Sequence, residues 1–438
     1  MNVHRKVYGL IILEGGFFAL WAISGDFLLL SLWMAVLILL FASFSWTRLA
    51  IKKISVQRFS KVKALAAGSV FSERLEIKNN GRQARYLLQI EDQSNLLYRI
   101  HSRAVSQLGG GEIRVQTIKA LVNQRGFYPL GPTRVSTGDP FGFFSAYVTF
   151  PAEKQLTVFP YSPPIPGFTT AGGNPSGEQD LLKRSAQPTP QAWGVREYQP
   201  RDPLNRVHWP LTLKKGQLMV KEFDRDTQTS VWIILDAQAG LYPHLVGSQA
   251  PALDWNLIPL KERGHYQLPR DAFEYAVSTG AALCHYYLDT GQSLGFASNG
   301  RQTSIFPAEK GSRQLNKLLF HLAGIHDDGN MDIINLLNQQ AKNIARGSLL
   351  LMITGRNNAL FSQSAQLARH WGLNLRVIQI CANSFVSAPA NAEDNSVNKN
   401  IIRISYGDDI SEILSMGIGA TYRKAASGQS LPQPNQRG

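Results

Sequence analysis

The N-terminal part of the chain contains two long apolar stretches separated by a short polar turn. Residues 7–23 are apolar apart from Glu14, and residues 27–46 form an uncharged run long enough to cross a bilayer. Only the polar residues 24–26 lie between the two stretches. This pattern predicts a two-helix transmembrane hairpin with basic flanks over residues 1–53.

Basic residues flank both outer ends of this hairpin. Arg5 and Lys6 precede it, and six more follow it: Arg48, Lys52, Lys53, Arg58, Lys61 and Lys63. The positive-inside rule therefore places both ends of the hairpin, and the soluble body of the chain, in the cytoplasm. A cleaved signal peptide is the alternative, because Ala22-x-Ser24 resembles a cleavage site; Glu14 and the immediate second stretch argue against it. Because neither stretch holds a second charge, we favour a protonated Glu14 packed on the partner helix over a proton or lipid contact.

Residues 54–161 alternate polar and apolar positions in short runs that end in turn-forming residues. Such runs occupy residues 70–81, 84–92 and 112–122, and glycines fill positions 109–111 between two of them. Short alternating strands at this spacing predict a small all-β, sandwich-like domain.

The pattern changes after residue 226, where near-continuous apolar runs alternate with helical periodicity. The expected strands are residues 231–236, 293–299, 348–354 and 375–381, and the expected helices are 270–288, 313–323, 331–345 and 359–371. Continuous apolar runs are typical of parallel strands that are buried on both faces. The alternation predicts an α/β domain over residues 227–424, so the chain as a whole is multi-domain.

Two further segments show no periodic pattern. Residues 162–193 are rich in Pro, Gly, Ser, Thr and Gln, and we expect a long irregular connection there. Residues 425–438 are polar and contain two prolines, which predicts a disordered tail.

Composition narrows the classes of partner. The chain has 438 residues and only two cysteines, which exclude a disulfide framework and a thiolate metal cluster. A net charge of +14 would suit anionic lipid, nucleic acid or an acidic protein. Because the positive residues are scattered, with no basic stripe interleaved with aromatics, nucleic-acid binding ranks last.

Charge, aromatic residues and turn formers gather in residues 194–226, which we call the signature segment. Its candidate binding residues are Gly194, Arg196, Tyr198, Asp202, Arg206, His208, Trp209, Lys221 and Phe223. In a structural interpretation, its charged residues form a salt-bridge network that holds the connector, with Tyr198 and Trp209 wedged beneath it. In a functional one, Arg196, Arg206, His208 and Lys221 bind an anionic group or an acidic partner. We favour the first, because no nucleophile or metal ligand accompanies the charges; Lys214-Lys215-Gly216 fits the tip of a hairpin.

Two shorter motifs, at residues 139–142 and 291–295, are also candidate sites. Asp139, Pro140, Phe141 and Gly142 form a turn whose phenylalanines can bury between domains, with partner docking as the alternative. Residues 291–295 match the G-x-S-x-G pattern of hydrolases. That motif requires a strand before the serine and a helix after it, and we expect the reverse order here.

The signature segment resembles the pattern of the domain of unknown function 58 family: Gly-x-Arg-x-Tyr, an Asp, an Arg, a His-Trp pair, then Lys-x-Phe. A second element of that family lies at residues 125–144 and ends in Asp139-Pro140-Phe141-Gly142. The resemblance implies a protein of the bacterial inner membrane that associates with MoxR-type AAA+ ATPases. It also implies a role in the maturation of envelope or membrane complexes.

The α/β region is similar to the von Willebrand factor A fold of that family, which is Rossmann-like. The resemblance implies a metal site built from a strand-end Asp-x-Ser-x-Ser with a distant Thr and Asp. Here Asp236 is followed by Ala237, Gln238, Ala239 and Gly240, so both serines are missing, and Arg356 stands near the expected second Asp. Because magnesium needs several oxygen ligands, we expect no metal, with Asp236 as the remnant of a degenerate site.

Together these features predict a membrane-anchored, non-enzymatic interaction or assembly factor without a cofactor. Its expected partners are the lipid bilayer and a MoxR-type AAA+ ATPase. The first alternative is an enzyme or ligand-binding protein that uses the signature segment as an anion site. The second alternative is a nucleic-acid-binding protein.

Overall fold

A computed structural model of the chain describes residues 2–60, 62–94, 103–166, 194–199, 207–222, 230–243, 266–356, 359–386 and 401–416. The chain forms two compact units. The first is built mainly on residues 1–161 and the second mainly on the residues that follow.

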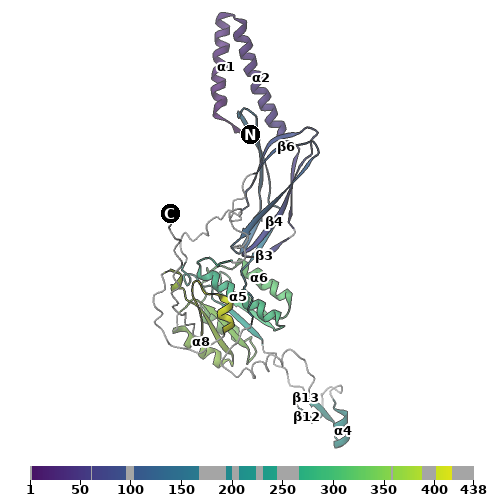
Figure 1. Cartoon of the computed structure of the whole chain (residues 1–438). Coiled ribbons are helices and arrows are strands. Elements are labelled where there is room, and N and C mark those ends of the chain that lie inside the picture. Colours follow the sequence, from purple (N-terminus) through teal and green to yellow (C-terminus); the bar gives the residue numbers. More distant parts are fainter. Residues whose placement is uncertain are drawn as a thin grey trace, which may run out of the picture. The chain divides into compact units, whose positions relative to one another are not determined.

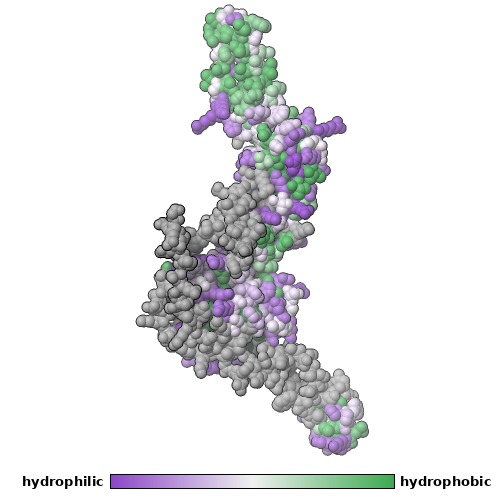
Figure 2. Space-filling view, in the orientation of Figure 1, coloured by the Kyte–Doolittle hydropathy of each residue, from purple (hydrophilic) through white to green (hydrophobic). Residues whose placement is uncertain are grey.

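The first unit begins with two apolar helices, α1 (Arg5–Ser24) and α2 (Phe27–Ala50), which run antiparallel as a hairpin (Figure 1). Gly25 turns the chain in the left-handed region with φ 66°, and the Asp26 side chain accepts a hydrogen bond from the Leu28 amide at 3.0 Å. Both helices are long and apolar enough to cross a membrane, and hydrophobic surface covers them (Figure 2). The two expected apolar helices are thus confirmed.

The β-strands of the first unit form three sheets. One has the order β1 (Asn2–Val3), β10 (Phe144–Phe150), β9 (Thr133–Gly138), β5 (Arg85–Asp92) and β6 (Arg103–Leu108). The second has the order β2 (Ile54–Ser60), β4 (Ser69–Asn79) and β7 (Ile113–Val122), and the third β3 (Ala64–Ala66), β11 (Lys154–Phe159) and β8 (Gly126–Leu130). Neighbouring strands are antiparallel except β3 and β11.

Alternation along these strands builds the core of the unit. Strand β4 buries every second side chain from Phe71 to Asn79. Leu75 and Ile77 of this strand share a core with Leu88 and Ile90 of β5, so the first two sheets contribute to one hydrophobic layer. The same alternation carries a charged residue inward, because position 73 is a glutamate.

The second unit contains a six-stranded sheet. Its order is β16 (Ser304–Glu309), β15 (Leu294–Ser298), β14 (Val231–Leu235), β17 (Leu349–Thr354), β18 (Asn374–Ile380) and β19 (Ile401–Ile404). All neighbours are parallel except β15 and β16. Counted along the chain, this is the order 3-2-1-4-5-6 of doubly wound α/β folds. The four expected strands are confirmed; β16 and β19 were not expected.

Helices cover the sheet and explain the continuous apolar runs. They are α5 (Ala272–Asp289), α6 (Ser312–Gly324), α7 (Ile333–Ala341), α8 (Ala359–His370), α9 (Asn383–Val386) and α10 (Ile410–Met416). Residues of α7 and α8 share a core with Trp232, Ile234 and Met352 of the sheet. The intervening side chains, such as Ile233 and Ile353, are also fully buried, and α5 contacts the strands that carry them. Strands β14 and β17 are therefore buried on both faces.

Candidate functional site

Three strands bring polar residues together at the carboxyl edge of the six-stranded sheet. Asp236 follows β14, Asn299 follows β15, and Thr354 ends β17 with Arg356 two residues later. Strand β14 lies between β15 and β17, which is where the strand order reverses. In open α/β sheets, ligands bind in the crevice outside the strand ends at this position. The fold therefore makes Asp236 the natural centre of a site.

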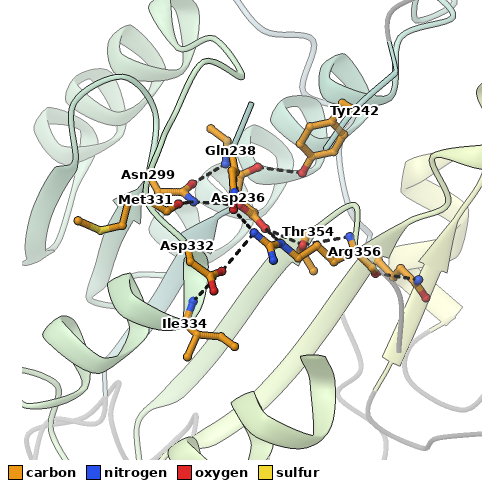
Figure 3. Close-up of polar contacts among 11 residues, drawn as sticks. Asp236, Gln238, Tyr242, Asn299, Met331, Asp332, Ile334, Thr354 and Arg356 are labelled. Carbon is orange, nitrogen blue, oxygen red and sulfur yellow. Dashed lines mark hydrogen bonds and ion pairs between the residues drawn. The ribbon is translucent and has the colours of Figure 1, made fainter. Parts of the chain in front are cut away.

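The carboxylate of Asp236 is fully buried, and each of its oxygens has partners (Figure 3). Oδ1 accepts hydrogen bonds from Asn299 Nδ2 at 2.9 Å and from the main-chain amide of Gln238 at 3.4 Å. Oδ2 accepts from Thr354 Oγ1 at 2.9 Å and from Arg356 Nε at 3.3 Å. A buried charge is costly unless it is paired and hydrogen-bonded, and here it is both.

Arg356 also connects this carboxylate to neighbouring elements. Its terminal nitrogen donates to Gln238 Oε1 and lies 3.2 Å from Asp332 Oδ1. Asp332 is the N-cap of α7 and accepts from the Ile334 amide at 3.5 Å. One guanidinium thus ties together the ends of β14 and β17 and the start of α7, while 18% of its side chain stays exposed.

With the Arg356 guanidinium in place, the residues around Asp236 do not fit a metal ion. The side chains of Asn299, Thr354 and Arg356 all turn N–H or O–H donors toward the carboxylate, and a metal would need oxygen ligands in place of these donors. The guanidinium lies beside Oδ2, where an ion would bind. Among the residues that the structure describes, no group of three or more His, Cys, Asp or Glu side chains could hold a metal.

A tyrosine and a glycine contact the main chain around Asp236. The Tyr242 hydroxyl donates to the main-chain oxygen of Asp236 at 2.9 Å. Burial raises the pKa of Tyr242 well above its usual value, and the charge of Asp236 raises it further, so the phenol remains a neutral donor. The Gly329 amide donates to the Ala237 carbonyl oxygen at 3.0 Å, and the Gly329 carbonyl oxygen accepts from the Ala239 amide at 2.8 Å. A side chain at 329 would overlap the Asn299 carbonyl oxygen.

The described part of the signature segment forms two short strands and a helix. Strand β12 (Gly194–Glu197) pairs antiparallel with β13 (Met219–Glu222), and α4 (Trp209–Lys215) lies between them in sequence. His208 caps α4 by accepting the Leu211 amide at 3.2 Å, and Gly216 ends it with φ 67°. The hairpin tip expected at 214–216 is therefore wrong: a capping side chain, a proline in the first turn and a glycine at the end favour a helix.

The structure separates the signature residues into three groups, of which one, Tyr198, His208 and Trp209, is described with its side chains; Tyr198 is half-buried. Asp202, Arg206 and Phe223 lie outside the described residues, and Gly194, Arg196 and Lys221 are described only as strand backbone. The salt-bridge network and the anion site both stay predictions. Trp209 is 58% exposed, so the expectation that it is wedged beneath the segment is wrong.

The outward face of α4 is both apolar and basic. Trp209 and Leu213, one helical turn apart, are 58% and 83% exposed, and Lys214 and Lys215 beside them are exposed too. Thr212 faces inward and accepts the Met219 amide at 3.0 Å. We call Trp209, Leu213, Lys214 and Lys215 the signature patch; the α4 end of Figure 2 carries both hydrophobic and hydrophilic surface.

The Asp139 turn connects β9 to β10 and is held by hydrogen bonds from main-chain amides to the Asp139 side chain. The Asp139 carboxylate accepts hydrogen bonds from the amides of Phe141, Phe143 and Phe144 at 3.0, 2.8 and 2.6 Å. Gly142 completes the turn with φ 71°. Phe144 is buried edge-on against Phe44 of α2, whereas Phe141 is 54% exposed. The Asp139 carboxylate thus holds the turn within the first unit, and burial of its phenylalanines between domains stays a prediction.

The β-strands also contain a buried ionic cluster that the sequence analysis missed. Arg58 donates to Glu73 at 2.8 Å, and also to Asp92 and to Thr133. Burial raises the pKa of Glu73, and the charge of Arg58 offsets part of this effect. A glutamate between Phe71 and Leu75 on the inward side of an alternating strand is the signal that could have found it.

Residues 291–295 have a helix before the serine and a strand after it, as we expected, and therefore do not form a nucleophile elbow. Helix α5 ends just before Gly291, which has φ 78°, and β15 begins at Leu294. The serine of this motif therefore precedes a strand, and the motif carries no hydrolase geometry.

No family model matches the chain. The "Uncharacterized protein YeaD" of Bacillus subtilis (strain 168) is 26% identical over 204 residues, which are 47% of this chain and 44% of the relative. The chain thus aligns with less than half the length of that relative.

Three solved structures show weak likeness to parts of the chain. The CARDB domain of PF1109 from Pyrococcus furiosus is 16% identical with TM-score 0.19, over 24% of this chain and 91% of that one. Proximal thread matrix protein 1 from mussel byssus is 11% identical with TM-score 0.27, over 43% and 47%. The Ro protein of Deinococcus radiodurans is 12% identical with TM-score 0.26, over 57% and 48%. Likeness of this size carries no argument about function.

Proposed function

We propose that this chain is a membrane-anchored, non-enzymatic interaction and assembly factor that acts with a MoxR-type AAA+ ATPase. The signature patch on α4 is the observation that carries this proposal. A helix that turns a tryptophan and a leucine outward leaves apolar surface that a partner can bury. Tryptophan is also among the residues that most often dominate the binding energy of protein interfaces.

The charge of the patch specifies the partner surface. Lys214 and Lys215 lie beside the two apolar side chains, so the complementary surface is an apolar pocket with an acidic rim. Interfacial membrane helices bury a long apolar face, and α4 has only seven residues and two outward apolar side chains. These features favour a protein partner over a lipid surface.

The proposal also assigns a role to the two apolar helices and to the second unit. Helices α1 and α2 anchor the chain in the bacterial inner membrane, with the basic flanks holding the soluble units in the cytoplasm. The sheet order, with Asp236 at the end of its first strand, supports a von Willebrand factor A-like fold for the second unit. In this proposal that unit serves as a binding module.

A detergent pull-down of the full-length protein, with and without ATP, tests this function. Wild-type protein is expected to recover an AAA+ ATPase, and a Leu213→Glu/Lys214→Glu variant is expected to lose it. Lys342→Glu is the matched control, because this lysine is also exposed but lies outside the patch. The proposal would be contradicted if the folded patch variant still recovered the ATPase. It would also be contradicted if the wild-type protein recovered no ATPase.

A further inference from the structure

We infer that Arg356 is the resident cation of the Asp236 site and replaces a divalent ion there with a covalently tethered one. This inference is independent of the proposed function. It rests on the position of the guanidinium at the strand-order reversal, where an α/β sheet of this type offers its ligand crevice.

The acceptors of Arg356 are the kind of atoms that a divalent ion prefers. The guanidinium contacts oxygens of Asp236, Gln238 and Asp332, which come from the end of β14, the following loop and the N-cap of α7. Carboxylate and amide oxygens are hard ligands suited to magnesium and calcium. One of these oxygens contacts Nε of the guanidinium and the other two contact a terminal nitrogen, so all three surround one cation.

The structure also fixes the arginine in place. The Arg356 amide donates to Thr354 Oγ1 at 3.2 Å, and its carbonyl oxygen accepts Gln379 Nε2 at 3.0 Å. Gln379 in turn accepts from Arg403 of the neighbouring strand β19 at 3.3 Å. These bonds tie the main chain of Arg356 to β17 and β18, so the guanidinium is tethered at the site whatever the concentration of free metal.

Two consequences follow for the second unit. Its fold and its binding behaviour are independent of divalent cations as long as the guanidinium is present. Removal of the guanidinium uncovers the oxygens of Asp236, Gln238 and Asp332, and this leaves a buried carboxylate without its counter-charge. The vacated site should then accept the divalent ion that Arg356 replaces.

The test is thermal unfolding of the full-length protein in detergent, in MnCl₂ or MgCl₂ against NaCl of equal ionic strength. Five proteins are compared: wild type, Asp236→Asn, Arg356→Ala, Asp236→Asn/Arg356→Ala and Arg403→Ala. We expect a saturable rise of the melting temperature with MnCl₂ in Arg356→Ala only. Arg403→Ala is the matched control, because it removes an arginine from the same sheet edge without uncovering Asp236.

Three results would overturn the inference. One is a saturable response of the wild type that Asp236→Asn abolishes, since the site would then hold a metal in addition to the arginine. Another is a folded Arg356→Ala variant that does not respond, and a third is an equal response of Arg403→Ala. Should Arg356→Ala not fold in metal-free buffer, MnCl₂ is expected to restore folding; no recovery would equally overturn it.

Discussion

Replacement of Arg356 by glutamine should destabilise the second unit far more than replacement of both charged partners. The single change leaves Asp236 charged and fully buried without a cation. Breaking a buried ion pair from one side costs about 3–5 kcal/mol. Because 18% of the arginine side chain is exposed, water can reach part of the vacated space, and we expect about 3 kcal/mol. This is a large share of a typical total stability of about 5–15 kcal/mol.

The paired change Asp236→Asn/Arg356→Gln removes both charges and retains groups that can hydrogen-bond to Asn299 and Thr354. Its cost should be about 1 kcal/mol, because neutral replacement of a buried pair is often close to neutral in stability. The two single losses should therefore exceed the double loss by at least about 2 kcal/mol. The single change Asp236→Asn completes the cycle.

Urea unfolding followed by far-ultraviolet circular dichroism measures these differences, in a buffer with a chelator so that no divalent ion replaces the arginine. Equal slopes against urea across the four proteins would show that the same surface is exposed on unfolding. Additive single losses, or an Arg356→Gln variant within about 0.5 kcal/mol of wild type, would refute the argument that the guanidinium compensates a buried charge.

Three further predictions concern other residues. Burial raises the folded-state pKa of Glu73, so its contribution to stability is present below the ordinary value of 4.5 and is lost as the pH rises through the folded value. Glu73→Gln should flatten the dependence of the unfolding midpoint on pH above 4.5, and an unchanged profile would contradict the assignment. Asp139→Ala removes the acceptor of three main-chain amides and should lower the unfolding free energy by about 1–3 kcal/mol. Asp139→Glu should restore only part of this loss. A melting temperature of Asp139→Ala equal to that of wild type would contradict the stabilising role of this carboxylate. Gly329→Ala forces a side chain against the Asn299 carbonyl oxygen and should cost about 1–3 kcal/mol. Gly300→Ala is the control, because its side chain would meet nothing closer than 3.5 Å; equal losses in the two variants would contradict the steric account.

The sequence was most informative where burial is two-sided. Strands β14, β15, β17 and β18 are continuous apolar runs because helices cover both faces, and such runs stand out without knowledge of the fold. Strand β16 alternates half-buried and exposed residues at the sheet edge, and β19 has only four residues. Neither gives a pattern strong enough to separate a strand from a loop.

The chemistry of the Asp236 site was only partly predictable. The missing serines and the arginine at 356 pointed to a degenerate metal site. The ion pair between Asp236 and Arg356 joins residues that are far apart in the chain, and it depends on the pairing of β14 with β17. Side-chain partners across such a separation follow from strand order and register, which residue patterns in one sequence do not determine.

The sequence also could not predict which side chains of the signature segment are exposed. A tryptophan near lysines fits a buried wedge as well as a binding surface, and the difference depends on which helical face packs against β13. The Thr212 contact to Met219 decides the orientation of α4, and it turns Trp209 and Leu213 outward.

Docking of an AAA+ ATPase on the signature patch is tested by titrating the ATPase recovered in the pull-down against the full-length protein in lipid nanodiscs. If the proposal holds, Trp209→Ala/Leu213→Glu weakens binding at least about 30-fold, the loss of one interface hot spot of about 2 kcal/mol. Lys342→Glu should bind as tightly as wild type. Equal affinity of the patch variant and the wild type, with both folded, would contradict the claim.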